Sequence, residues 1–136
     1  MPRHWLFKTE PNEYSYSDLE QEKKTVWNGV SNNLARKNLR EVRLGDEVLL
    51  YHSGDEKAIV GIAEAITDPY PDPNETDEKL VVVNIKPNRR LPQPLTLLEI
   101  KAIEELSDFD LVRLPRLSVM PVSPAQWHLL QDALKH

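Results

Sequence analysis

The chain has 136 residues, of which 40% are hydrophobic and 29% are charged, and its formal net charge is −5. This length predicts one domain over residues 1–136 with a single hydrophobic core, and no apolar run approaches the roughly 20 residues of a membrane-spanning helix. The absence of cysteine excludes disulfides, thiol nucleophiles and cysteine zinc sites, and the negative charge argues against a protein that coats nucleic acid non-specifically.

Residues 3–8 alternate in the manner of a strand with at least one buried face. The turn-forming residues 9–12 end that strand. Ser17 with Glu20 three positions later is a capping-box pattern, which predicts a short surface helix over residues 18–23.

The next predicted helix covers residues 33–42 and is capped by Ser31 or Asn32. Its apolar positions have helical spacing and would face the core. Gly45 suits a left-handed turn residue after the helix. This helix carries several basic side chains, which form either a solvated face or a positively charged edge beside a pocket.

Two strands are predicted over residues 47–52 and 58–67, joined by a hairpin-length loop. The second strand has apolar residues on both faces, which favours a central place in a sheet. Gly61 within it indicates a bulge or a close contact.

Prolines interrupt the predicted strands in the second half of the chain. Residues 68–74 are predicted not to continue a ladder and residues 89–94 to form a connection, with a strand over residues 80–86 between them. A capping box at Thr96 and Glu99 predicts a helix through residue 103. A closing strand over residues 116–122 and a final helix after Ser123 complete an α+β domain of about five strands.

The most informative stretch begins at Trp27. Asn28 and Asn32 offer amide groups, Gly29 permits close approach of a ligand to the backbone, and Arg36 adds a planar cation. A flat heterocycle with hydrogen-bonding groups on its rim needs such a set. The alternative is that Trp27 is an ordinary core tryptophan.

The sequence resembles the EVE domain family at several motifs in the same order. The matching residues are Trp27-Asn28-Gly29-Val30, Asn32, Ala35-Arg36, Leu39-Arg40, Gly45-Asp46 and Tyr51-His52-Ser53, with Trp5-Leu6-Phe7-Lys8-Thr9-Glu10-Pro11, Tyr14-Ser15, Arg116-Leu117-Ser118-Val119 and Pro121-Val122 at the two ends. The resemblance covers nearly the whole chain. It implies a PUA-like fold, a small mixed β-barrel flanked by short helices, with a pocket for a modified base of nucleic acid.

The resemblance also implies a set of ligand-binding residues: Trp5, Lys8, Thr9, Trp27, Asn28, Gly29, Asn32, Tyr51, His52, Arg116 and Ser118. The basic residues Arg36, Lys37 and Arg40 are expected to contact the nucleic-acid backbone. Structural alternatives remain, because Trp5 suits the core, Tyr51 or His52 suits a structural hydrogen bond, and Arg116 suits a surface ion pair.

The chain departs from the family pattern at three places. Ser31 stands where members usually carry arginine, Asn33 and Leu34 stand where an aromatic residue and glutamine are usual, and Leu80 stands near a usual tryptophan. The missing arginine removes a bidentate donor. We therefore expect an altered or weakened choice of ligand and an unchanged fold.

Two other functions remain open at this point. Lys8, Thr9 and a carboxylate from Glu10 or Glu64 suit a small amidohydrolase acting on modified nucleosides, if burial lowers the pKa of the lysine. A regulatory domain that binds a free small metabolite is the third candidate. DNA, RNA and a free nucleoside are all possible partners, and the sequence does not predict the oligomeric state.

No cofactor, metal or membrane partner is predicted. The four histidines, His4, His52, His128 and His136, lack the spacing of zinc ligands. The first residues of the chain lack the apolar core of a signal peptide, so the sequence predicts a cytoplasmic location.

Overall fold

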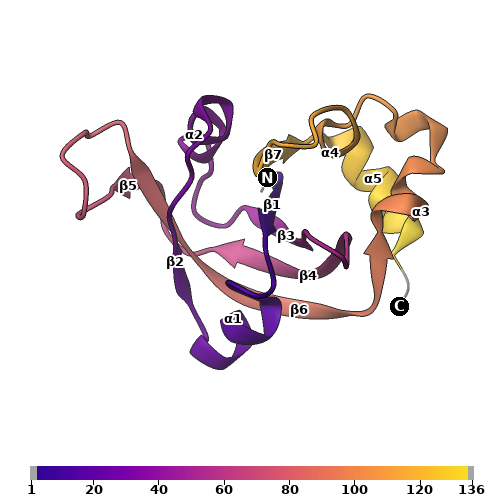
Figure 1. The fold of residues 1–136 in the computed structure, drawn as a ribbon, viewed down its shortest axis with the longest axis horizontal. Helices are drawn as coiled ribbons and strands as arrows, with labels where there is room; N and C mark the ends of the chain where they lie inside the picture. Colours follow the sequence, from indigo (N-terminus) through magenta and orange to yellow (C-terminus); the bar gives the residue numbers. More distant parts are fainter. Residues whose placement is uncertain (1–2, 135–136) are drawn as a thin grey trace.

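The computed structural model describes residues 3–134 and is built around a curled, mixed β-sheet (Figure 1). Its strands follow the order β2-β6-β4-β3-β1-β7, with β5 paired to β6 outside this path. The paired strands β1 and β3 are parallel, and the other pairs are antiparallel. The strands are β1 (His4–Thr9), β2 (Thr25–Trp27), β3 (Glu47–His52), β4 (Ala58–Ala65), β5 (Tyr70–Pro71), β6 (Val81–Thr96) and β7 (Val119–Val122).

Short helices surround this half-barrel, with α1 beside β6 and α2 next to β7. The helical segments are α1 (Tyr16–Glu22), α2 (Asn33–Leu39), α3 (Leu97–Lys101), the 3-10 turn η1 (Glu104–Leu106), α4 (Asp110–Arg113) and α5 (Pro124–Ala133). The prediction of an α+β domain is confirmed. The predicted number of strands was too low, because the described residues form seven strands instead of about five.

The helix starts are set by capping side chains. Asn32 caps α2 by accepting from the backbone N–H of Ala35 at 3.0 Å. Thr96 and Ser123 form the capping boxes predicted for α3 and α5. The box of α1 was assigned to the wrong serine, since Ser15 is the cap and pairs with Asp18.

Gly61 in β4 provides the close contact that the sequence predicts. A Cβ atom added there would overlap the ring of Tyr16, and the pairing of β4 with β6 shifts register beside this glycine. The Tyr16 hydroxyl donates to the carbonyl of Ile62 at 2.8 Å. This contact draws α1 onto the sheet, so its buried residues Tyr16 and Leu19 join the core, contrary to the expected surface helix.

Strand β6 is the largest difference from the sequence prediction. It continues through the predicted connection at residues 89–94 and reaches Thr96. Its second half pairs with β4 through two register shifts, which accommodate prolines that cannot donate to a regular ladder. The predicted break at residues 68–74 is also wrong in part, because Tyr70 and Pro71 pair with the start of β6.

Two smaller differences from the sequence prediction concern the outer strands β2 and β7. Strand β2 has only three residues, too few for a periodic signal, and pairs with Val83 to Ile85 of β6. Strand β7 begins at Val119, so Arg116 and Ser118 lie in the preceding segment instead of a strand. None of the described helices is long and apolar enough to span a membrane.

Candidate functional site

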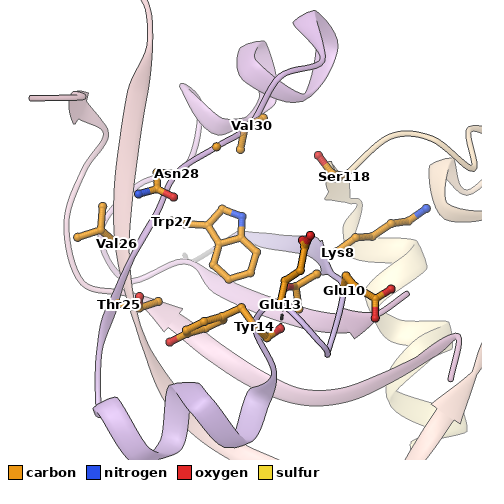
Figure 2. A pocket seen from close by; sticks show the side chains of 12 residues that line it. Lys8, Glu10, Glu13, Tyr14, Thr25, Val26, Trp27, Asn28, Val30 and Ser118 are labelled. Carbon is orange, nitrogen blue, oxygen red and sulfur yellow. Dashed lines mark hydrogen bonds between the residues drawn. The ribbon is translucent and has the colours of Figure 1, made fainter. Parts of the chain in front are cut away.

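A cavity of about 480 Å³ opens where β1 ends beside β2. Its walls come from the end of β1, the turn before α1, strand β2, the loop after β2 and one residue before β7 (Figure 2). Its volume lies within the range of ordinary small-molecule sites. The lining residues are Lys8, Thr9, Glu10, Glu13, Tyr14, Thr25, Val26, Trp27, Asn28, Gly29, Val30 and Ser118. We call this space the Trp27 cavity.

Trp27 is nine-tenths buried, and its ring is held from two sides. Its centroid lies 5.3 Å from that of Phe7, and Tyr14 meets it edge-on at 6.2 Å. Among residues 3–134 every fully buried side-chain nitrogen and oxygen has a hydrogen-bond partner. The indole Nε1 has none within this range, so it is open to the cavity, as Figure 2 shows.

Tyr14 is fixed by hydrogen bonds at both ends of the residue. Its carbonyl accepts from the Thr9 hydroxyl at 2.7 Å, and its own hydroxyl donates to Glu22 at 2.7 Å. Burial is the main cause that raises the pKa of Tyr14 to about 12. The phenol therefore stays neutral at physiological pH and presents an aromatic wall in a fixed orientation.

Three charged residues line the cavity but face different ways. The Lys8 ammonium donates to the Pro115 carbonyl at 2.7 Å, and burial lowers its pKa. The Glu10 carboxylate accepts from the backbone of Asn12 at 3.2 Å. In Figure 2 the side chains of Lys8 and Glu10 point away from the indole, whereas Glu13 extends toward it.

The loop between β2 and α2 closes one side of the cavity. Gly29 adopts a left-handed φ of 72°, which a residue with a side chain rarely adopts. Arg36 of α2 donates from Nε to the Val30 carbonyl at 2.8 Å and so ties the loop to the helix. A second space of about 240 Å³ lies across this loop, lined in part by Ser31 and Leu80, two positions where the chain departs from the EVE pattern.

The structure brings six of the predicted ligand-binding residues together around the Trp27 cavity: Lys8, Thr9, Trp27, Asn28, Gly29 and Ser118. They come from three separate parts of the chain. Trp27 and Asn28, which motivated the prediction, lie side by side in the cavity wall. The ligand-binding role of these six residues remains a prediction.

The other five lie outside this cavity. The Trp5 indole is buried and donates to Asp46 at 2.8 Å. Tyr51 is buried beneath Lys8, with 5.6 Å between the ammonium and the ring centroid. We therefore leave Trp5 and Tyr51 out of the proposed site.

His52 is engaged on both ring nitrogens. Its Nε2 accepts from the Tyr16 backbone N–H at 3.0 Å, so Nδ1 carries the proton that is donated to Glu56 at 2.7 Å. Asn32 caps α2, and it also lines a separate shallow apolar space together with the exposed Arg116. These three positions lie outside the Trp27 cavity, and their role in ligand binding remains a prediction.

The three basic residues proposed to contact the backbone lie on or beside α2. Arg36 is anchored to the Val30 carbonyl, and Arg40 donates to the Lys79 carbonyl at 3.1 Å. Lys37 is exposed. Of the three, Arg36 lines the second space, which it shares with Asp72 and Glu75 of the acidic loop.

Sequence reasoning missed several cavity residues, chiefly Glu13, Tyr14 and Thr25. Tyr14 belongs to a matching EVE motif and could have been selected on that ground. Glu13 and Thr25 carry no local signal, because a turn and a three-residue strand bring them to the cavity. Within residues 3–134 no cluster of three acidic or histidine side chains could hold a metal ion, and His136 lies outside the described residues.

Comparisons with known proteins agree with this architecture. The EVE domain model matches residues 3–133. Human thymocyte nuclear protein 1 is 28% identical over 91% of this chain and 70% of the human protein. The chicken protein of the same name is 38% identical, but the match covers 56% of this chain and 36% of the chicken protein. The chain thus spans only part of the length of these relatives.

Solved structures give closer matches. A Rhodopseudomonas palustris protein has a TM-score of 0.90 and 38% identity over 98% of this chain and 96% of its own. The human THYN1 protein, solved in complex with DNA containing 5-methylcytosine, has a TM-score of 0.87 and 26% identity over 96% of each chain. An ASCH protein from Zymomonas mobilis, with a TM-score of 0.64 and 11% identity, shares the fold alone. The fold is PUA-like, and the chain belongs to the EVE domain family.

Proposed function

We propose that this protein is a binding module that holds one modified base of a nucleic acid in the Trp27 cavity. The observation that carries the proposal is the indole of Trp27, which is nine-tenths buried yet has no partner for Nε1 within residues 3–134, at the wall of a cavity of about 480 Å³. A donor so placed is satisfied by a ligand with an acceptor on its rim. The structural likeness to a human protein solved with 5-methylcytosine DNA supports the same choice.

The energetics suit a single base lifted out of a strand. Packing one base against an aromatic side chain contributes about 1 to 3 kcal/mol. The net charge of −5 gives the whole surface little attraction for phosphates. Affinity must therefore come chiefly from the base in the cavity, with Arg36, Lys37 and Arg40 guiding the adjoining backbone.

The direct test is binding of labelled oligonucleotides that are identical except for one cytosine, which is either methylated at C5 or unmodified. Fluorescence anisotropy should give tighter binding to the methylated strand. The proposal would be refuted if the protein bound the methylated and unmodified strands equally and also showed no preference for any strand in a panel carrying other modified bases.

A hydrolase acting on modified nucleosides is the second candidate, and one observation favours it. Burial lowers the pKa of Lys8, and Lys8 and Glu10 line the same cavity. The lysine nitrogen is, however, held by the Pro115 carbonyl at 2.7 Å and points away from the indole. Incubation with acylated nucleosides, followed by chromatography, tests this candidate, and turnover that Lys8→Met removes would establish it.

A further inference from the structure

We infer that Glu13 selects the base by its exocyclic amino group. This inference rests on the proposed function and names the class of base that the same cavity takes. The cavity would accept an amino base such as a cytosine derivative and reject its keto counterpart.

The position of Glu13 is fixed by the turn that precedes α1. The backbone N–H groups of Glu13 and Tyr14 both donate to the Glu10 carbonyl at 2.9 Å. From the other side, the Thr9 hydroxyl holds the Tyr14 carbonyl at 2.7 Å. The turn thus sets the backbone of Glu13 at the cavity wall, from where its carboxylate extends toward the Trp27 ring (Figure 2).

The carboxylate is available for a ligand. Within residues 3–134 no hydrogen bond or ion pair engages the Glu13 side chain, whereas Glu10 accepts from Asn12 and Lys8 donates to Pro115. Glu13 is exposed, so its carboxylate lies hydrated at the cavity wall and accepts from no protein donor among these residues. Trp27 Nε1 faces the cavity as a donor without an acceptor.

This pair of groups favours one arrangement on the rim of the base. An ionised carboxylate has acceptors only, and it pairs with the N4 amino group of cytosine in base recognition. A ring nitrogen or carbonyl oxygen of the same base can accept from Nε1–H. A keto oxygen in place of the amino group would set two acceptors against each other and displace water from the exposed carboxylate without replacing its hydrogen bonds, which costs binding free energy.

The test compares 5-methylcytosine with thymine, which has the same ring skeleton and methyl group but carries a keto oxygen at C4 and a hydrogen on N3. Each base is placed at one position of otherwise identical single-stranded oligonucleotides, which avoids a mismatch that would ease base extrusion. We expect the wild-type protein to prefer 5-methylcytosine by about tenfold. In Glu13→Gln, whose amide both donates and accepts, this ratio should fall to about twofold or less.

Glu10→Gln is the matched control, because it removes the same charge from the same cavity at a side chain that points away from the indole. Glu13→Gln should lower the ratio, whereas Glu10→Gln should keep the wild-type ratio. Equal binding of the two bases by wild type, or an unchanged ratio in Glu13→Gln, would overturn the inference. Absence of binding to every strand would instead refute the proposed function.

Discussion

The ring of Trp27 lies 5.3 Å from that of Phe7, centroid to centroid, with the planes tilted by 38°. Phe7 is fully buried in the core, so this contact holds the indole from the inside. The Nε1 of the same indole, which has no hydrogen-bond partner within residues 3–134, lies at the cavity wall. One residue therefore serves the core and the cavity together, and experiments must separate the two roles.

Replacement of Trp27 by phenylalanine keeps an aromatic ring against Phe7 but removes the Nε1 donor and part of the stacking area. We expect affinity for the preferred oligonucleotide to fall by at least about tenfold. The smaller side chain should cost about 1 to 2 kcal/mol of stability, which lowers the melting temperature by several degrees. Anisotropy and thermal denaturation measure the two effects separately.

Trp5→Phe is the control for this variant. Trp5 lies outside the cavity and donates to the buried Asp46, so its loss should lower stability by a similar or larger amount without changing affinity. The assignment of Trp27 to the binding site fails if Trp27→Phe binds as tightly as wild type.

Arg36→Met should loosen the loop that closes the cavity, because it removes the 2.8 Å bond from Nε to the Val30 carbonyl. Amide hydrogen exchange should accelerate over residues 28–31, and affinity should fall by about fivefold, the value of one hydrogen bond. Unchanged exchange in this loop would show that the bond does not hold it.

Lys37→Met tests the contact with the nucleic-acid backbone. Lys37 lies one residue further along α2 and is exposed. Its replacement should therefore leave amide hydrogen exchange over residues 28–31 unchanged. If Lys37 contacts a phosphate, the slope of log affinity against log salt should decrease in magnitude by about one. A wild-type affinity that does not depend on salt would instead favour a neutral metabolite as the ligand.

Asp46 is expected to be the most sensitive buried polar residue. Its carboxylate accepts from Trp5 Nε1 at 2.8 Å and from the backbone N–H groups of Arg3 and Arg43 at 3.0 and 2.9 Å. Asp46→Ala leaves these donors unsatisfied and should cost about 3 kcal/mol in urea denaturation. The exposed Asp68 accepts from the backbone N–H of Leu44 at 2.9 Å, and its alanine variant should cost less than about 1 kcal/mol. Equal losses in the two variants would contradict this ranking.

Two tyrosines predict a loss of stability at high pH. Burial raises the pKa of both Tyr14 and Tyr16 from about 10 to about 12. Since the folded pKa is the higher one, their contribution is complete below pH 10 and is lost as the pH rises through 12. The free energy of unfolding should therefore decrease as the pH is raised from 10 to 12. The decrease should be less steep in the double variant Tyr14→Phe/Tyr16→Phe. A double variant with the wild-type slope would exclude the tyrosines as the cause.

The local signals of the sequence were sufficient for most helices and central strands. Capping side chains at Asn32, Thr96 and Ser123 act within a few residues, so their patterns can be read directly. Strand β6 could not be predicted past its prolines, because its continuation depends on register shifts against β4. Such shifts are tertiary features without a local pattern.

The site was predictable only in part for a related reason. The motif at Trp27 identified the wall of the cavity, but Glu13 and Thr25 reach it through the packing of a turn and a short strand. Conversely, Trp5 and His52 belong to matching motifs but lie outside the cavity, where they bond to Asp46 and to the Tyr16 backbone respectively. A shared motif does not distinguish a residue that binds a ligand from one that supports the site.

The most direct test of the central claim follows the indole N–H signals of the protein by NMR. The chain has three tryptophans, and Trp5 and Trp127 lie outside the cavity, the first bonded to Asp46 and the second stacked on His4 at 4.1 Å. Titration with a single-stranded oligonucleotide containing 5-methylcytosine should shift the Nε1–H signal of Trp27 and leave the other two in place. A shift of Trp5 or Trp127 with an unmoved Trp27 signal would contradict the account.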